Sequence, residues 1–152
     1  MSTENLRIES RQPQPVVCVR TSASDVGSVL PRLLPAALAW VGEHGGEAAG
    51  APIVRYLKVA PGAFEIEAGY PTTAPMKASG DIVAFELPGG DIAVAEHRGP
   101  YNTLGETAAA LVEYVRSQGR SVAGPYWESY VANPSTVSGP TKLVTEVCIP
   151  LA

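Results

Sequence analysis

The chain repeats itself, and this repeat limits the folds open to it more than any other feature of its sequence. Residues 50–56 (GAPIVRY) align without a gap on residues 124–130 (GPYWESY), with glycine first and tyrosine last in both. Further on, residues 67–71 (EAGYP) match residues 146–150 (EVCIP). The first match follows, in each half, an apolar stripe of helical spacing that ends in glycine. Two matches in the same order predict a duplicated structural module.

The local patterns predict the same order of elements in both halves. β-Branched and apolar runs indicate strands, and apolar residues at helical spacing indicate helices. We therefore predict an α+β fold, one domain over residues 1–152, with two β-α-β-β modules as pseudo-repeats of about 14–72 and 80–151, both helices on one face of a pseudo-twofold sheet. The predicted elements are strands at 14–21, 51–59 and 63–71 with a helix at 25–43, and strands at 81–87, 91–97, 125–132 and 142–150 with a helix around 104–118.

Two prolines lie within the first predicted helix. Pro31 suits a first helical turn, where its missing N–H removes no hydrogen bond. Pro35 would then lie in the interior, where proline favours a kink or a restart. We expect this helix to begin late, with Pro31 in its first turn, and to end at residues 44–46, where glycine can adopt the left-handed backbone of a C-terminal cap.

The composition argues against several classes of partner. The 152-residue chain has a formal net charge of −4, and its eleven lysines and arginines are scattered singly, whereas a nucleic-acid surface needs a basic stripe. No apolar run approaches the roughly 18 residues of a membrane span, and residues 1–11 lack the apolar core of a signal peptide. We therefore predict a cytoplasmic protein that binds neither nucleic acid directly nor a membrane.

The cysteines and histidines do not form a metal-site pattern. Cys18 and Cys148 lack CxxC spacing, and the histidines are His44 and His97. Neither a zinc site nor a disulfide framework follows from these spacings. We predict no metal and no cofactor, and two reduced, buried cysteines that act as small apolar fillers.

The richest chemistry lies in the second copy of the GAPIVRY match, where one carboxylate stands among aromatic residues. Alternation along a strand places Tyr126, Glu128 and Tyr130 on one face and Trp127 on the other. The gap-free alignment places Tyr56 at the position equivalent to Tyr130. A pocket on this face would hold one acid and several phenols, which suits hydrophobic cations or flat aromatic rings.

Several motifs of the chain resemble the GyrI-like small-molecule-binding family. This family forms the effector-binding domain of many AraC- and MerR-type bacterial regulators and also occurs as stand-alone proteins. The resemblance covers residues 16–151 and is strongest in the second half. The motifs are Glu96-His97-Arg98-Gly99-Pro100-Tyr101, then Leu104 and the helix, then residues 124–130, then Thr145-Glu146 through Pro150-Leu151.

The resemblance implies a fold, a site and several activities. It implies a duplicated β-α-β-β module of the SHS2 type, with a curved antiparallel sheet and a ligand pocket on its concave face. In members that bind multidrug cations, the pocket acid lies on the strand that here carries Glu128. Other stand-alone members hydrolyse cyclopropane-bearing natural products, and others inhibit DNA gyrase. We find no helix-turn-helix segment, which argues against direct transcriptional control.

Each candidate side chain also has a plainer interpretation. Glu128 would be an exposed strand residue paired with a cross-strand Arg or Lys. Trp127 would belong to the core under the helices unless the strand bulges, and Tyr101 would pack or cap at a helix start. His97 would be structural or solvated rather than a base. The candidate ligand contacts are Glu128, Tyr126, Tyr130, Tyr56, Trp127, Tyr101 and Glu146, with Glu128 and Tyr130 as catalytic residues if the protein is an enzyme.

The acids of the repeated EAGYP and EVCIP segments have their own interpretation. Glu65 and Glu67 alternate with Ile66, so we expect both acids to face solvent. Glu146 is kept as a second candidate acid.

Three functions of different classes remain open. The first is a stand-alone protein that senses or sequesters hydrophobic, often cationic or aromatic compounds, with Glu128 at the base of its pocket. The second is a hydrolase of cyclopropanoid or similarly reactive natural products, with Glu128 as acid/base. The third is a protein-binding inhibitor of the gyrase-binding kind, for which the sequence shows no large exposed apolar segment.

Overall fold

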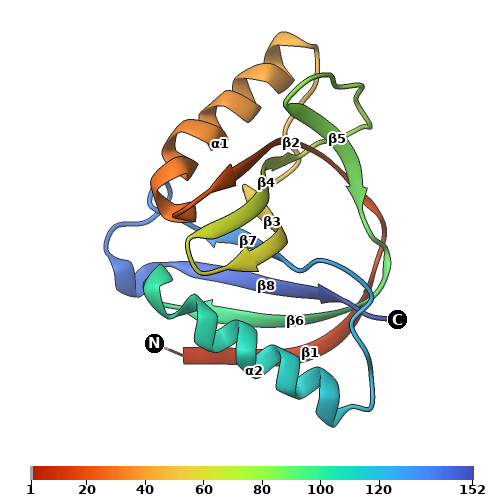
Figure 1. The fold of residues 1–152 in the computed structure, drawn as a ribbon, viewed down its shortest axis with the longest axis vertical. Helices are drawn as coiled ribbons and strands as arrows, with labels where there is room; N and C mark the ends of the chain where they lie inside the picture. Colours follow the sequence, from red (N-terminus) through yellow and green to blue (C-terminus); the bar gives the residue numbers. More distant parts are fainter. Residues whose placement is uncertain (1) are drawn as a thin grey trace. The chain divides into compact units, whose positions relative to one another are not determined.

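The computed structural model describes residues 2–152, which divide into two units (Figure 1). The first unit is Pro13–Pro88, a continuous segment. The second unit combines the chain up to Gln12 with Gly89–Ala152. Each unit contains one long helix and four strands, so the α+β class and the duplicated β-α-β-β module predicted from the sequence are confirmed.

The first unit is an antiparallel sheet of order β3-β4-β2-β5 with one helix. The helix α1 packs against β4 and β2. Apolar side chains of both elements, among them Leu33 of α1 and Ile66 of β4, are buried where they meet. The elements are β2 (Gln14–Ala23), α1 (Val26–Glu43), β3 (Ile53–Ala60), β4 (Ala63–Pro71) and β5 (Ile82–Leu87).

The second unit has the corresponding sheet order, β7-β8-β6-β1. Its helix α2 lies against β6, β1 and β8, as Figure 1 shows for β6 and β1. Leu111 and Val115 form the buried side of α2. The elements are β1 (Ser2–Arg11), β6 (Gly90–Arg98), the 3₁₀ turn η1 (Tyr101–Thr103), α2 (Leu104–Ser117), β7 (Trp127–Ala132), the 3₁₀ turn η2 (Pro140–Lys142) and β8 (Val144–Pro150).

The two units repeat individual hydrogen bonds as well as elements. The amide of Ala49 donates to the carbonyl of Pro71 across 2.8 Å, and the amide of Ala123 donates to that of Pro150 across the same distance. Both helices also end alike, because a glycine with positive φ follows each of them, at 78° for Gly45 and 69° for Gly119. Glycine adopts this left-handed backbone without steric cost.

The outer strand of each unit comes from just before the first module strand of the other unit. β5 immediately precedes β6 in the chain but pairs with β2, and β1 precedes β2 but pairs with β6. The sequence patterns predict no strand at β1. Its alternation is broken by a bulge between Glu4 and Arg7, where Asn5 has a φ of 59°, and its composition is polar.

The late start predicted for the first helix is wrong. α1 begins at Val26 and continues through both Pro31 and Pro35. Both prolines are exposed, whereas Leu33 and Ala37 are buried. Water on the exposed side can therefore replace the hydrogen bonds that the prolines cannot make, while apolar packing holds the other side. Within residues 2–152 no helix has both the length and the apolar character needed to cross a lipid bilayer.

Candidate functional site

Glu128 is a buried carboxylate that accepts a hydrogen bond from Tyr130, two positions further along β7. Its relative exposure is 4%, and that of Tyr130 is 5%. The hydroxyl of Tyr130 donates to Oε1 of Glu128 across 2.8 Å. Residues two apart in a strand share a face, as predicted for this pair. The interpretation of Glu128 as an exposed residue in a surface ion pair is therefore wrong.

The pairing of the strands shows which face of the sheet carries Glu128. Glu128 lies opposite Val147, and Val147 lies opposite Ala95. Ala95 shares its face with His97, whose ring bonds to Thr107 of α2. Paired residues and residues two apart point to the same side of a sheet. Glu128 therefore lies on the side of the second unit's sheet that carries α2.

Two further tyrosines lie within the electrostatic reach of Glu128. Tyr101, in η1, meets the ring of Tyr130 edge-on, with 5.5 Å between ring centroids. Burial, and then the charge of Glu128, raise the pKa of Tyr126 to about 12, and the same two causes raise the pKa of Tyr101. The sequence predicts a strand at 125–132 that includes Tyr126. In the structure β7 begins at Trp127, so Tyr126 directly precedes it. We call Glu128, Tyr130, Tyr101 and Tyr126 the Glu128 cluster.

Trp127 and Glu146 lie on the other face of this sheet. Trp127 pairs with Cys148 and Glu146 pairs with Ser129, each one position out of phase with Glu128. Trp127 is 3% exposed, so its expected burial is confirmed, but it is not under α2. Strand parity was correct in separating Trp127 from Glu128; the error lay in assigning the helix to the side of Trp127.

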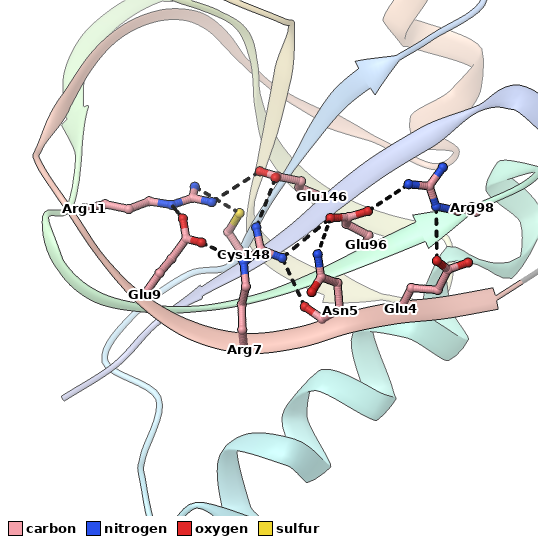
Figure 2. A network of polar contacts seen from close by, with 9 residues as sticks. All are labelled: Glu4, Asn5, Arg7, Glu9, Arg11, Glu96, Arg98, Glu146 and Cys148. Atoms are coloured by element: carbon pink, nitrogen blue, oxygen red, sulfur yellow. Dashed lines mark hydrogen bonds and ion pairs between the residues drawn. The ribbon is translucent and has the colours of Figure 1, made fainter.

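Glu146 belongs to a network of alternating charges, shown in Figure 2. Its Oε1 lies 3.3 Å from Nη2 of Arg11, and its Oε2 lies 3.5 Å from Nη2 of Arg7. Glu9 bonds to Nε of both arginines at 2.7 Å. Both arginines belong to β1, the strand missing from the sequence-based prediction. Glu146 thus holds the edge strand to β8, and the structure does not bring it to the Glu128 cluster.

Glu67, the counterpart of Glu146 in the first unit, is fully buried, so the prediction that it faces solvent is wrong. Its Oε2 accepts a hydrogen bond of 2.9 Å from Nε of Arg20, and its Oε1 accepts one of 2.8 Å from Nε of Arg55. Arg55 also lies over the ring of Phe85, 4.1 Å from its centroid. Two arginines therefore compensate the cost of burying this acid, and the ring of Phe85 stabilises the guanidinium of Arg55.

The remaining candidates of the sequence analysis have simpler positions. Tyr56 is a half-buried residue of β3 in the first unit, opposite Ile66. Cys18 and Cys148 are free and buried, which confirms that expectation, and burial raises the pKa of Cys148 to about 12. Over residues 2–152, His, Cys, Asp and Glu side chains form no group of three able to hold a metal ion.

This arrangement of a duplicated module with a buried acid among tyrosines agrees with the family comparison. Residues 4–152 match the model of the GyrI-like small molecule binding domain. The chain belongs to this family. No curated protein matches the chain.

Solved structures confirm the GyrI-like fold at low sequence identity. The C-terminal domain of EcmrR superposes with a TM-score of 0.84 at 17% identity, covering 97% of both chains. The chain spans 57% of the EcmrR chain in its DNA complex. A hydrolase from Listeria innocua gives 0.65 at 11% identity, over 97% of this chain and 91% of the hydrolase. SAV2435 bound to tetraphenylphosphonium gives 0.65 at 14% identity, over 98% and 94%.

Proposed function

We propose that the protein binds small hydrophobic compounds, with a preference for organic cations and flat aromatic molecules, at the Glu128 cluster. The observation that carries the proposal is a nearly fully buried carboxylate with three tyrosines around it inside one unit. Membership of a small-molecule-binding family supports the same class of ligand. The role that fits is sensing or sequestration of such compounds.

The preference for cations follows from the physical cost of a buried charge. A carboxylate removed from water needs hydrogen bonds or an opposite charge. The hydroxyl of Tyr130, a neutral donor, supplies one such hydrogen bond to Glu128. A cation beside Glu128 would gain Coulombic attraction that burial strengthens. Tyrosine faces would each add about 0.5–2 kcal/mol to a cation placed over them.

Two structural relatives guide the choice of ligands for a test. SAV2435 was solved with tetraphenylphosphonium, which is a hydrophobic cation. EcmrR was solved in a complex with DNA, and its C-terminal domain has the fold of this chain. We therefore choose tetraphenylphosphonium and a rhodamine-type cationic dye as probes, and a neutral aromatic compound of similar size as the comparison.

The test is a fluorescence titration of the protein with each probe. Glu128→Gln should weaken binding of the cations by about 10- to 100-fold, which corresponds to a charged contact of about 1.5–3 kcal/mol. Binding of the neutral aromatic should change by less than about threefold. Glu146→Gln is the matched control, because this acid lies on the other face and should leave both affinities unchanged. Equal cation affinity in wild type and Glu128→Gln would refute the proposal.

A second candidate function is hydrolysis of cyclopropanoid or similarly reactive natural products. The observation in its favour is the Glu128–Tyr130 hydrogen bond, since a carboxyl group beside a phenol can serve as acid or base while the phenol orients substrate or water. A hydrolase among the structural relatives supports it. Mass spectrometry separates the two functions, because hydrolysis adds one water to the compound and simple binding leaves its mass unchanged.

A further inference from the structure

Both ring nitrogens of His97, near the end of β6, are hydrogen-bonded, and the side chain is 1% exposed. Nε2 lies 3.0 Å from the carbonyl oxygen of Pro100 and 3.0 Å from Oγ1 of Thr103. Nδ1 lies 2.6 Å from Oγ1 of Thr107 in α2. One imidazole therefore ties the loop before α2 to the helix itself.

The chemistry of these partners fixes the direction of the bonds. A carbonyl oxygen only accepts, so Nε2 of His97 carries a proton and donates it to Pro100. In the neutral ring Nδ1 is then an acceptor, and Thr107 donates its hydroxyl proton to it. Thr3 of β1 donates in turn to Thr107 across 2.7 Å. The chain of donors holds the ring in one tautomer and one orientation.

The loop held by His97 carries Tyr101. Pro100 directly precedes η1 and Thr103 is its last residue, and both contact the same nitrogen of His97. Thr103 also donates to the carbonyl of Pro100 across 3.1 Å. Tyr101 itself is 37% exposed, so packing surrounds it only in part, and its ring meets that of Tyr130 edge-on. The residues on both sides of Tyr101 are thus bonded to one imidazole nitrogen.

We propose that His97 is a positioning residue that holds Tyr101 against Tyr130 and beside Glu128, and so sets the affinity of the site without touching the ligand. The affinity part rests on the proposed function. The positioning part concerns the ligand-free protein and can be tested separately.

The test of positioning is an NMR titration of the tyrosine ring carbons in ligand-free protein. In wild type the pKa of Tyr101 lies above its ordinary value of 10.0, because of burial and of the charge of Glu128. In His97→Leu it should fall back toward 10.0, while Tyr126, which is outside η1, keeps its pKa of about 12. His97→Gln should restore the wild-type value for Tyr101, since its amide can donate to Pro100 as Nε2 does.

The test of affinity uses the cationic dye. Loss of an aromatic contact predicts about five- to tenfold weaker binding in His97→Leu and in Tyr101→Ala. The double variant should lose no more than either single one, because both changes remove the same contact. If wild type binds no dye, the proposed function fails, and the NMR titration still decides whether His97 positions Tyr101.

Three results would overturn the positioning role. One is an unchanged pKa of Tyr101 in His97→Leu, and another is a fall in the pKa of Tyr126 alongside it, which would indicate general unfolding. If His97→Leu does not fold, Thr103→Val removes one of the two links to Nε2 and should lower the pKa of Tyr101 in part; no change there would be the third. Thr3→Val, at the far end of the donor chain, is the control and should leave Tyr101 unaffected.

Discussion

Glu67 and Glu146 occupy equivalent positions in β4 and β8, but the arginines that pair with them come from different strands. Glu67 is bonded to its two cross-strand neighbours, Arg20 on β2 and Arg55 on β3. The corresponding neighbours of Glu146 are a glutamate and a serine, and its arginines come from the edge strand β1. Glu67 is fully buried, whereas the side chain of Glu146 is 24% exposed.

This difference predicts unequal costs for the same substitution. Glu67→Gln leaves Arg55, which is mostly buried, without its counter-charge, so we expect a loss of about 2–4 kcal/mol in the free energy of unfolding. Glu146→Gln should cost less than about 1 kcal/mol, because its ion pairs are partly exposed. Urea unfolding of both variants measures the two losses in the free energy of unfolding. Equal losses would show that the burial of Glu67 does not control its contribution.

The close approach of β4 to β2 predicts that Gly69 tolerates no side chain. A Cβ at this position would lie 2.0 Å from the carbonyl oxygen of Val17 and 2.7 Å from Cα of Cys18, and neither backbone atom can move without breaking the pairing. We expect Gly69→Ala to lower the free energy of unfolding by about 3 kcal/mol or more. Thermal unfolding, followed by circular dichroism, measures the loss.

Gly105 provides the matched control for this substitution. It lies in α2, and a Cβ there meets no atom within 4 Å. Gly105→Ala should stabilise the protein by about 0.5–1 kcal/mol, because alanine loses less backbone entropy in a helix. If Gly69→Ala were as stable as Gly105→Ala, the spacing of β2 and β4 described above would be wrong.

The raised pKa of Tyr126 predicts a loss of stability in alkaline solution. The ordinary pKa of 10.0 applies to the unfolded chain, and the folded value is about 12. The unfolded state therefore releases its proton first, so the contribution of Tyr126 is complete below pH 10 and is lost as the pH rises toward 12. Tyr126→Phe should flatten this slope in urea unfolding at pH of about 9 and about 11.

A titration of tyrosinate absorbance separates the two causes of this shift. Glu128→Gln should lower the pKa of Tyr126 only in part, because burial is the larger cause and the charge of Glu128 the smaller. A complete return to 10.0 in this variant would contradict that order.

The charge network on β1 predicts that the stability of the fold decreases in acid. Hydrogen bonds from Arg7 and then from Arg11 lower the pKa of Glu9 below its ordinary value of 4.5. A lowered folded pKa means that Glu9 contributes fully above pH 4.5 and loses its contribution as the pH falls through the folded value. Glu9→Gln should therefore be less stable than wild type at neutral pH, with the difference closing in acid. A constant difference across this range would speak against the network.

Much of the fold was predictable because its signals are local. The β-branched and alternating runs predict most of the strands, and strand parity alone predicts that Glu128 and Tyr130 share one face. Parity could not show which face carries a helix, since that depends on how the chain folds back, and Trp127 was assigned to the wrong side for this reason.

The rest of the site depends on contacts between residues far apart in the sequence. Tyr101 reaches Tyr130 from a turn before α2, and only the tertiary structure brings them together. The repeat also gave no indication of the partners of Glu67, because the match of residues 50–56 with 124–130 aligns Arg55 with Ser129 and shares no charged residue. The role proposed for His97 depends on the hydrogen bonds at both ring nitrogens, which the sequence does not indicate.

The origin of the outer strands has a consequence for the order of synthesis. The first unit is one continuous stretch of chain, so all its strands can pair as soon as residues up to Pro88 have been made. β1 is synthesised before every strand of the first unit, yet its partner β6 begins only at Gly90. Its native partner is therefore absent while the first unit is being made, and we expect the charges of β1 to disfavour pairing with other chains during that time.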